Sequence, residues 1–91
     1  MANKNRPYTE EIIEESVVIR TFSANIPDEE LQWHWDEESR SVEPLAPNDW
    51  KFQFDNKLPI EINKQIYIPA GVIHRVIKGT TDLIVKIEKN V

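Results

Sequence analysis

Residues 66–76 read Ile-Tyr-Ile-Pro-Ala-Gly-Val-Ile-His-Arg-Val, and this stretch decides the fold. Two apolar runs flank Pro69 and Gly71, which predicts a strand, a tight turn and a second strand. Pro69 cannot donate a hydrogen bond to a neighbouring strand, and Gly71 can adopt positive φ without steric cost. The pair therefore ends one strand and reverses the chain. We expect the next strand to begin at or just before His74, which places this histidine at a barrel rim.

The rest of the chain repeats the pattern of short strands separated by turns. Residues 31–36 and 50–54 alternate between apolar and polar side chains, as half-buried strands do, and the aromatic side chains of 50–54 are expected in the core. Residues 16–22 are rich in β-branched residues, which also favours a strand. Further strands are predicted at residues 40–45, 58–62, 65–68, 74–77 and 83–88. About eight short strands at close spacing are typical of a small antiparallel β-barrel or jelly-roll sandwich.

The composition is that of a single globular domain. The chain has 91 residues, of which 40% are hydrophobic and 30% are charged. Its net charge of -5 disfavours a nucleic-acid partner, because such binding needs clustered Lys and Arg. The lack of cysteine excludes disulfides and thiolate metal sites. No stretch resembles a signal sequence or a membrane helix, so we expect a cytoplasmic protein without a membrane partner.

The domain boundary is expected near the N-terminus. Residues 1–10 are polar and are predicted to form an N-terminal arm, and residues 11–91 are predicted to form one domain. Ile12 and Ile13 are adjacent rather than three or four residues apart, so a helix is not expected there.

The spacing Pro-x-Gly-x-x-His at Pro69, Gly71 and His74 resembles the second sequence motif of the cupin superfamily. Cupins are small β-barrels in which this histidine is usually a metal ligand. Their full motif is G-x5-P-x-G-x2-H-x3-N. Asn63 stands here at the first glycine position and Lys78 at the final asparagine position.

The first cupin motif, G-x5-H-x-H-x3 or 4-E-x6-G, matches less closely. His34 keeps the first histidine position, Asp36 stands at the second, and Arg40 or Ser41 occupies the glutamate position. The two glycine positions hold Asp28 and Asn48. The resemblance spans residues 28–78 and implies a cupin-type barrel whose motif histidines point inward.

His34, Asp36 and His74 have the composition of a facial triad, two imidazoles and one carboxylate, which holds non-haem Fe(II) with open positions. Residues 34 and 36 of one strand would share a face, and a residue on a neighbouring strand could complete the group. We therefore predict a metal site at the barrel mouth for Fe, Mn, Ni or Zn.

Arg40 leaves three interpretations open. In the first, a metal binds and Arg40 lies to one side, where it holds the carboxylate of a small substrate, with Gln53 also lining the pocket. In the second, Arg40 pairs with Asp36 in a metal-free barrel. In the third, the polar side chains of residues 31–36 face solvent and the apolar side chains of the same segment face the core. These apolar side chains are Leu31, Trp33 and Trp35.

Inward-facing histidines would turn Trp33 and Trp35 outward. Two exposed tryptophans form the kind of apolar patch that marks an interface, and cupins commonly dimerise through the outer face of one sheet, so a homodimer is expected. The function predicted is a cupin-like metal-binding protein, with or without enzymatic activity on a small organic acid. The alternative is a metal-free binding or structural module in a homodimer or larger assembly.

Overall fold

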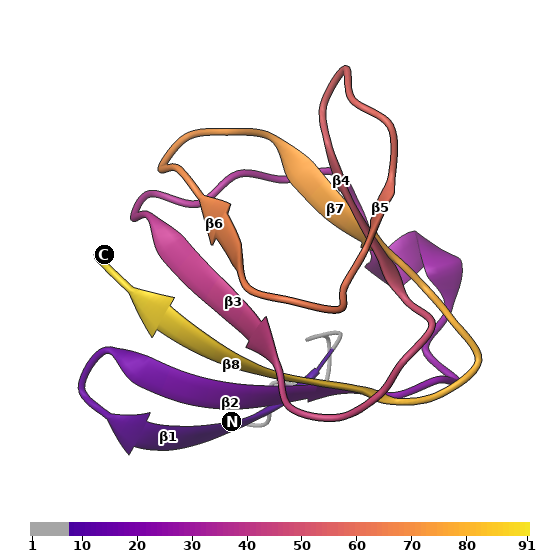
Figure 1. Cartoon of the computed structure of the whole chain (residues 1–91), viewed down its shortest axis with the longest axis horizontal. Coiled ribbons are helices and arrows are strands. Elements are labelled where there is room, and N and C mark those ends of the chain that lie inside the picture. Colours follow the sequence, from indigo (N-terminus) through magenta and orange to yellow (C-terminus); the bar gives the residue numbers. More distant parts are fainter. Residues whose placement is uncertain (1–7) are drawn as a thin grey trace.

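The computed structural model describes residues 8–91, and its regular secondary structure is almost entirely antiparallel β-strand (Figure 1). The expected N-terminal arm, residues 1–10, lies mostly outside the described residues. No helix between residues 8 and 91 is long and apolar enough to cross a membrane. The elements in chain order are β1 (Thr9–Glu14), β2 (Val17–Phe22), the 3-10 helix η1 (Asp28–Glu30), β3 (Arg40–Pro44), β4 (Lys51–Phe54), β5 (Ile60–Glu61), β6 (Ile66–Ile68), β7 (His74–Ile77) and β8 (Leu83–Lys89).

The strands form two sheets that face each other around the interior (Figure 1). One sheet has five strands in the order β1-β2-β8-β3-β6, and the other has three in the order β5-β4-β7. All neighbouring strands are antiparallel. This arrangement confirms the small antiparallel β-barrel or sandwich predicted from the sequence.

Alternation along the strands builds one apolar core between the sheets. Trp50 is 1% exposed and Phe52 is 3% exposed, and Phe54 packs against them, so the predicted aromatic row is confirmed as core. Each large side chain buried in this way stabilises the fold by about 1.5–3 kcal/mol. The other buried members come from the five-stranded sheet and the loops: Val18, Ile26, Ile62, Ile66, Ile68, Leu83, Val85 and Ile87.

Two segments differ from the sequence prediction. Residues 31–36 form no ladder strand, and only His34 makes a β-bridge, with His74. Their alternating pattern does not form one buried apolar face, because Trp33 and Trp35 are both exposed and Leu31 alone of the three packs against the core. Residues 9–14 do form a strand, β1, although five of its six residues are exposed. Pairing of its backbone with β2 determines this strand, so its side chains carry no alternating signal.

Candidate metal site

The backbone holds the three predicted ligands together at the barrel mouth. The amide of His34 donates to the carbonyl of His74 over 3.0 Å, and the amide of His74 donates back to His34 over 2.8 Å. Gly71, at φ +79°, donates its amide to the carbonyl of Asp36 over 2.8 Å. The proline-glycine turn before β7 therefore positions the segment that carries His34 and Asp36.

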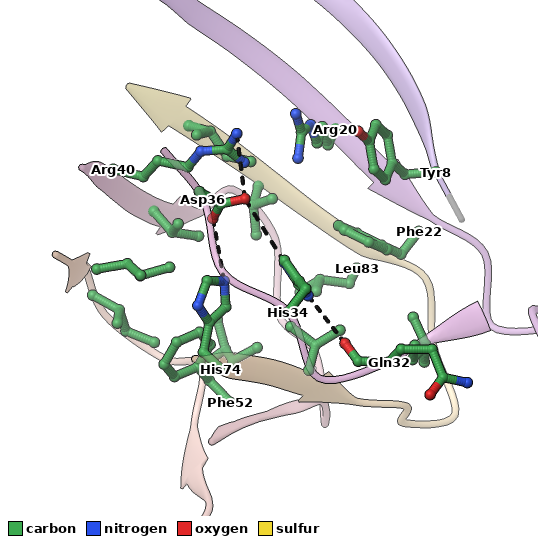
Figure 2. Close-up of a pocket in the computed structure, with 18 of the residues that line it drawn as sticks. Tyr8, Arg20, Phe22, Gln32, His34, Asp36, Arg40, Phe52, His74 and Leu83 are labelled. Atoms are coloured by element: carbon green, nitrogen blue, oxygen red, sulfur yellow. Dashed lines mark hydrogen bonds and ion pairs between the residues drawn. The ribbon is translucent and has the colours of Figure 1, made fainter. Parts of the chain in front are cut away.

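The side chains of these three residues converge. One ligand atom of each lies within 4.8 Å of the others. The distance from His74 Nε2 to Asp36 Oδ2 is 3.4 Å, and that from His34 Nε2 to Asp36 Oδ1 is 4.0 Å. Figure 2 shows both imidazoles and the carboxylate around one end of a cavity. The structure thus brings together the two imidazoles and the carboxylate of the predicted triad.

Each imidazole is oriented through its other nitrogen. His34 Nδ1 lies 3.0 Å from the carbonyl oxygen of Gln32, and His74 Nδ1 lies 2.8 Å from that of Val72. A carbonyl only accepts hydrogen bonds, so both Nδ1 atoms carry the proton, and in the neutral ring Nε2 presents a lone pair. Metal-binding histidines are usually oriented in this way.

The carboxylate of Asp36 lacks a partner that would satisfy it. Its Oδ2 atom is buried and accepts no hydrogen bond from any residue in the described range 8–91. Two imidazole lone pairs and a carboxylate therefore meet with no protein donor between them. Such a set of acceptors requires a cation or a proton for stability, and its nitrogen and oxygen atoms fit a divalent transition metal.

Arg40 lies beside the triad but is engaged mainly elsewhere. Its Nη2 and Nε donate to Glu38 Oε2 over 2.6 and 3.0 Å, whereas Nη2 lies 3.5 Å from Asp36 Oδ1. Burial alone would raise the pKa of Asp36, but the contact with His74 and the charge of Arg40 oppose this and hold the pKa below its ordinary value. Asp36 is therefore ionised and available to a cation at neutral pH.

The other predicted site residues lie on the outside of the barrel. Trp33 and Trp35 are 41% and 57% exposed, so the interpretation that buried them in the core is wrong. Gln53 does not line the cavity, because its neighbour Phe52 occupies the inward face of β4. It accepts a hydrogen bond from Arg75 over 3.0 Å, and the Arg75 guanidinium lies 4.5 Å from the Trp33 ring centre. The homodimer expected on this surface stays a prediction.

The triad opens into a cavity of about 370 Å³ whose lining includes a buried charged residue not identified from the sequence. Arg20 on β2 is 8% exposed and lines this cavity. Its Nε donates to Glu10 Oε2 over 2.8 Å, and its guanidinium lies 4.1 Å from the ring centre of Tyr8. The signal was present in the sequence, because Arg20 alternates with Val18 and Phe22, which also face inward.

No family model and no curated protein matches the sequence. The DMSP lyase DddQ from Ruegeria pomeroyi DSS-3 superposes with a TM-score of 0.73 at 10% identity, over 93% of this chain and 47% of the lyase. A cupin domain from Bordetella pertussis Tohama I gives 0.57 at 22% identity, over 94% of this chain and 97% of that one.

An RmlC-like cupin from Shewanella frigidimarina NCIMB 400 gives a TM-score of 0.60 at 10% identity, over 100% of this chain and 89% of that one. The chain spans less than half the length of the lyase, so the comparison with that protein concerns one part of it. At these identities the shared property is the fold, and the chemistry has to be argued from the residues of the site. The chain folds as a cupin-type domain.

Proposed function

We propose that this domain binds one divalent transition-metal ion through His34 Nε2, the Asp36 carboxylate and His74 Nε2. The observation that carries the proposal is the Asp36 carboxylate between the two imidazoles, whose buried Oδ2 lies 3.4 Å from His74 Nε2 and has no donor in the described part of the chain. Fe(II), Mn(II), Ni(II) and Zn(II) all accept this ligand set. Three protein ligands leave positions open for a further ligand.

The chemistry proposed is metal-assisted conversion of a small organic acid. A bound metal would supply a Lewis acid that polarises an oxygen of this ligand. The chain's own residues contribute orientation, because the Gln32 and Val72 carbonyls hold the two imidazole planes. One structural neighbour is a DMSP lyase, so lyase reactions belong among the first activities to test.

A second candidate function is a metal-free binding or structural module. Arg40 Nη2 lies 3.5 Å from Asp36 Oδ1, and a protonated His74 would lie 3.4 Å from Asp36 Oδ2. These two cations could neutralise Asp36 without a metal. In that case Trp33 and Trp35 would be the functional surface, as the contact between two copies of the domain.

Metal titration of untagged protein tests the proposal. Protein purified without chelators would be analysed for metal content and then titrated with Mn(II), Zn(II) and anaerobic Fe(II). We expect about one equivalent of bound metal, which is lost in His34→Gln and His74→Gln. Asp49→Asn is a matched control. It removes a carboxylate that binds Thr80 in the loop after β7, at the end of the β4–β7 pair opposite His74. Failure of all three metals to bind at millimolar concentration would favour the metal-free module.

Arg40→Gln distinguishes the two candidates further. If Arg40 only neutralises Glu38, its removal leaves metal binding intact or strengthens it, since a nearby positive charge is lost. Loss of the folded state in this variant would instead indicate that Arg40 is the structural partner of Asp36. Circular dichroism and urea unfolding of the metal-free protein separate these outcomes.

A further inference from the structure

Among residues 8–91, and apart from the exposed Glu30, the charges around the cavity fall into pairs with one member left over. Arg20 pairs with Glu10 at 2.8 Å, and Arg40 pairs with Glu38 at 2.6 Å. Asp36 remains as a single negative charge. If a dication binds there and both histidines stay neutral, the site carries one net positive charge.

A partly buried net charge is costly unless a counter-charge lies close to it. Glu30 also lines the cavity, but it is exposed and screened by water. The charge count therefore favours a ligand with a single negative charge.

Arg20 has hydrogen-bonding groups left for such a ligand. A guanidinium carries five N–H donors, and Arg20 engages only its Nε with the residues of the described range 8–91. Its two Nη groups make no hydrogen bond or ion pair there. Arg40, by contrast, commits both Nε and Nη2 to Glu38.

The side chain of Arg20 is also held in a defined orientation. Its guanidinium lies against the Tyr8 ring, and Glu10, directly opposite on β1, fixes the Nε edge. Figure 2 shows its nitrogen end directed toward the part of the cavity where Arg40 and Asp36 lie. A buried, oriented guanidinium with free Nη groups is suited to a carboxylate, which it can bind with two parallel hydrogen bonds.

The rest of the cavity wall favours a ligand whose body is apolar. Aliphatic side chains from three strands of the five-stranded sheet line the cavity, among them Val42, Ile66, Ile68, Val85 and Ile87. A volume of about 370 Å³ is near the lower end of small-molecule sites. The cavity therefore suits a short ligand with one charged end.

We propose that the site takes a small monocarboxylate with an apolar body and that Arg20, rather than Arg40, holds its carboxylate. The inference rests on the proposed function, because the bound metal supplies the charge that the ligand balances. The apolar body extends along the aliphatic wall, and the end remote from Arg20 reaches toward His34, Asp36 and His74.

Calorimetric titration of Zn(II)-loaded protein with hexanoate tests this inference, with hexan-1-ol as the uncharged probe of equal length. We expect hexanoate to bind at least tenfold more tightly than the alcohol, since charge-assisted hydrogen bonds are the strong ones. The double variant Glu10→Gln/Arg20→Gln removes the guanidinium and leaves the net charge unchanged. This double variant should bind hexanoate about 10- to 100-fold more weakly than the wild type does, and its affinity for hexan-1-ol should be unchanged. Arg20→Lys should retain part of the affinity.

Arg75→Gln is the matched control, because Arg75 lies on the outer face beside Gln53 and should not affect hexanoate binding. Zn(II) affinity is measured separately in every variant. Absence of metal binding in the wild type would contradict the proposed function. Normal metal binding combined with no hexanoate binding, or with equal hexanoate binding in the double variant, would overturn the inference about Arg20 alone.

Discussion

Asp36 and Asp49 are the same residue type in opposite situations. Asp49 accepts hydrogen bonds from the Thr80 amide at 2.7 Å, the Thr80 hydroxyl at 2.6 Å and the Thr81 amide at 3.3 Å. Among residues 8–91, the side-chain carboxylate of Asp36 makes only ion pairs, of 3.4 Å or longer. Its Oδ2 atom is buried and accepts no hydrogen bond from these residues.

The two carboxylates belong to opposite ends of the β4–β7 pair. His74 at one end of β7 pairs with Phe54, and Ile77 at the other end pairs with Lys51. Asp36 contacts His74 at the first end, and Asp49 binds the loop that follows Ile77 at the second.

This contrast separates a structural carboxylate from a candidate metal ligand. The bonds of Asp49 are satisfied within the chain, so it ties the loop after β7 to the start of β4. The oxygens of Asp36 are left available to something outside the chain. Unsatisfied buried groups lower stability and therefore tend to be found where function requires them.

The largest effect should come from exchanging each carboxylate for an amide. Asp36→Asn should lower metal affinity by at least about 100-fold, because even loss of an outer-shell partner costs 10- to 100-fold. Asp49→Asn should leave metal affinity unchanged and lower the free energy of unfolding, since one acceptor becomes a donor facing Thr80. Metal titration and urea unfolding of both variants measure this double difference. Similar metal affinities in the two variants would show that Asp36 and Asp49 do not differ as metal ligands.

The two glycines that flank β7 should also differ in their sensitivity. A Cβ at Gly79 would lie 2.1 Å from Asp49 Oδ1 and 2.7 Å from its backbone carbonyl carbon, so Gly79→Ala should cost about 1–3 kcal/mol through overpacking. A Cβ at Gly71 would meet no atom within 4 Å, so Gly71→Ala should cost about 1–2 kcal/mol through its positive φ alone.

Metal titration adds a second contrast between these glycines. Only Gly71→Ala should also change metal affinity, because Gly71 donates to Asp36. Urea unfolding of the metal-free variants gives the stability cost. A metal affinity altered by Gly79→Ala would show that the two ends are coupled.

The two histidines should contribute unequally to metal binding. The side chain of His74 is 5% exposed and that of His34 is 53% exposed, so water can replace His34 more readily as a ligand. His34→Gln should therefore reduce metal affinity by about tenfold less than His74→Gln does. His34→Gln should also leave the melting temperature of the metal-free protein nearly unchanged. Equal losses of affinity would indicate that the exposed imidazole is held as firmly as the buried one.

The smallest effect is the pH dependence of stability that arises from Asp49. The hydrogen bond from the Thr80 hydroxyl, with those from the Thr80 and Thr81 amides, lowers the pKa of Asp49 below 3.8. The stability that these bonds contribute is therefore present above pH 3.8 and is lost as pH falls through the folded-state pKa. Urea unfolding at pH 5 and below pH 3.8 measures the free energy of unfolding. This free energy should fall with pH in the wild type, and the fall should be smaller in Asp49→Asn. An identical loss in the variant would assign the pH dependence to other groups.

The parts of the fold that could be predicted are those fixed by local chemistry. The turn at Pro69 and Gly71 follows from a missing donor and a tolerated φ, and it places His74 at the start of β7 as expected. The aromatic row from Trp50 to Phe54 follows from alternation and burial.

What could not be predicted depends on tertiary context. Residues 31–36 alternate like a strand, yet only His34 pairs, because most of the segment crosses the barrel mouth without a neighbouring strand. Arg40 was expected either to hold a substrate or to pair with Asp36, and no pattern in the sequence indicated that Glu38, two residues away, also engages it. Alternation along β2 predicts that Arg20 faces inward, but its role also requires knowledge that β2 faces the same cavity as β7, which no local pattern contains.

The exposure of Trp33 and Trp35 has a practical consequence for optical measurements. These indoles immediately flank His34 in the sequence and face solvent, whereas Trp50 is 1% exposed within the core. Solvent-facing indoles emit at longer wavelength than buried ones, so the fluorescence spectrum divides into a component from the barrel mouth and one from the interior. A paramagnetic ion at the mouth would quench the long-wavelength component first, and unfolding would shift the short-wavelength one. The chain therefore carries its own pair of spectroscopic reporters, one for occupancy and one for integrity of the fold.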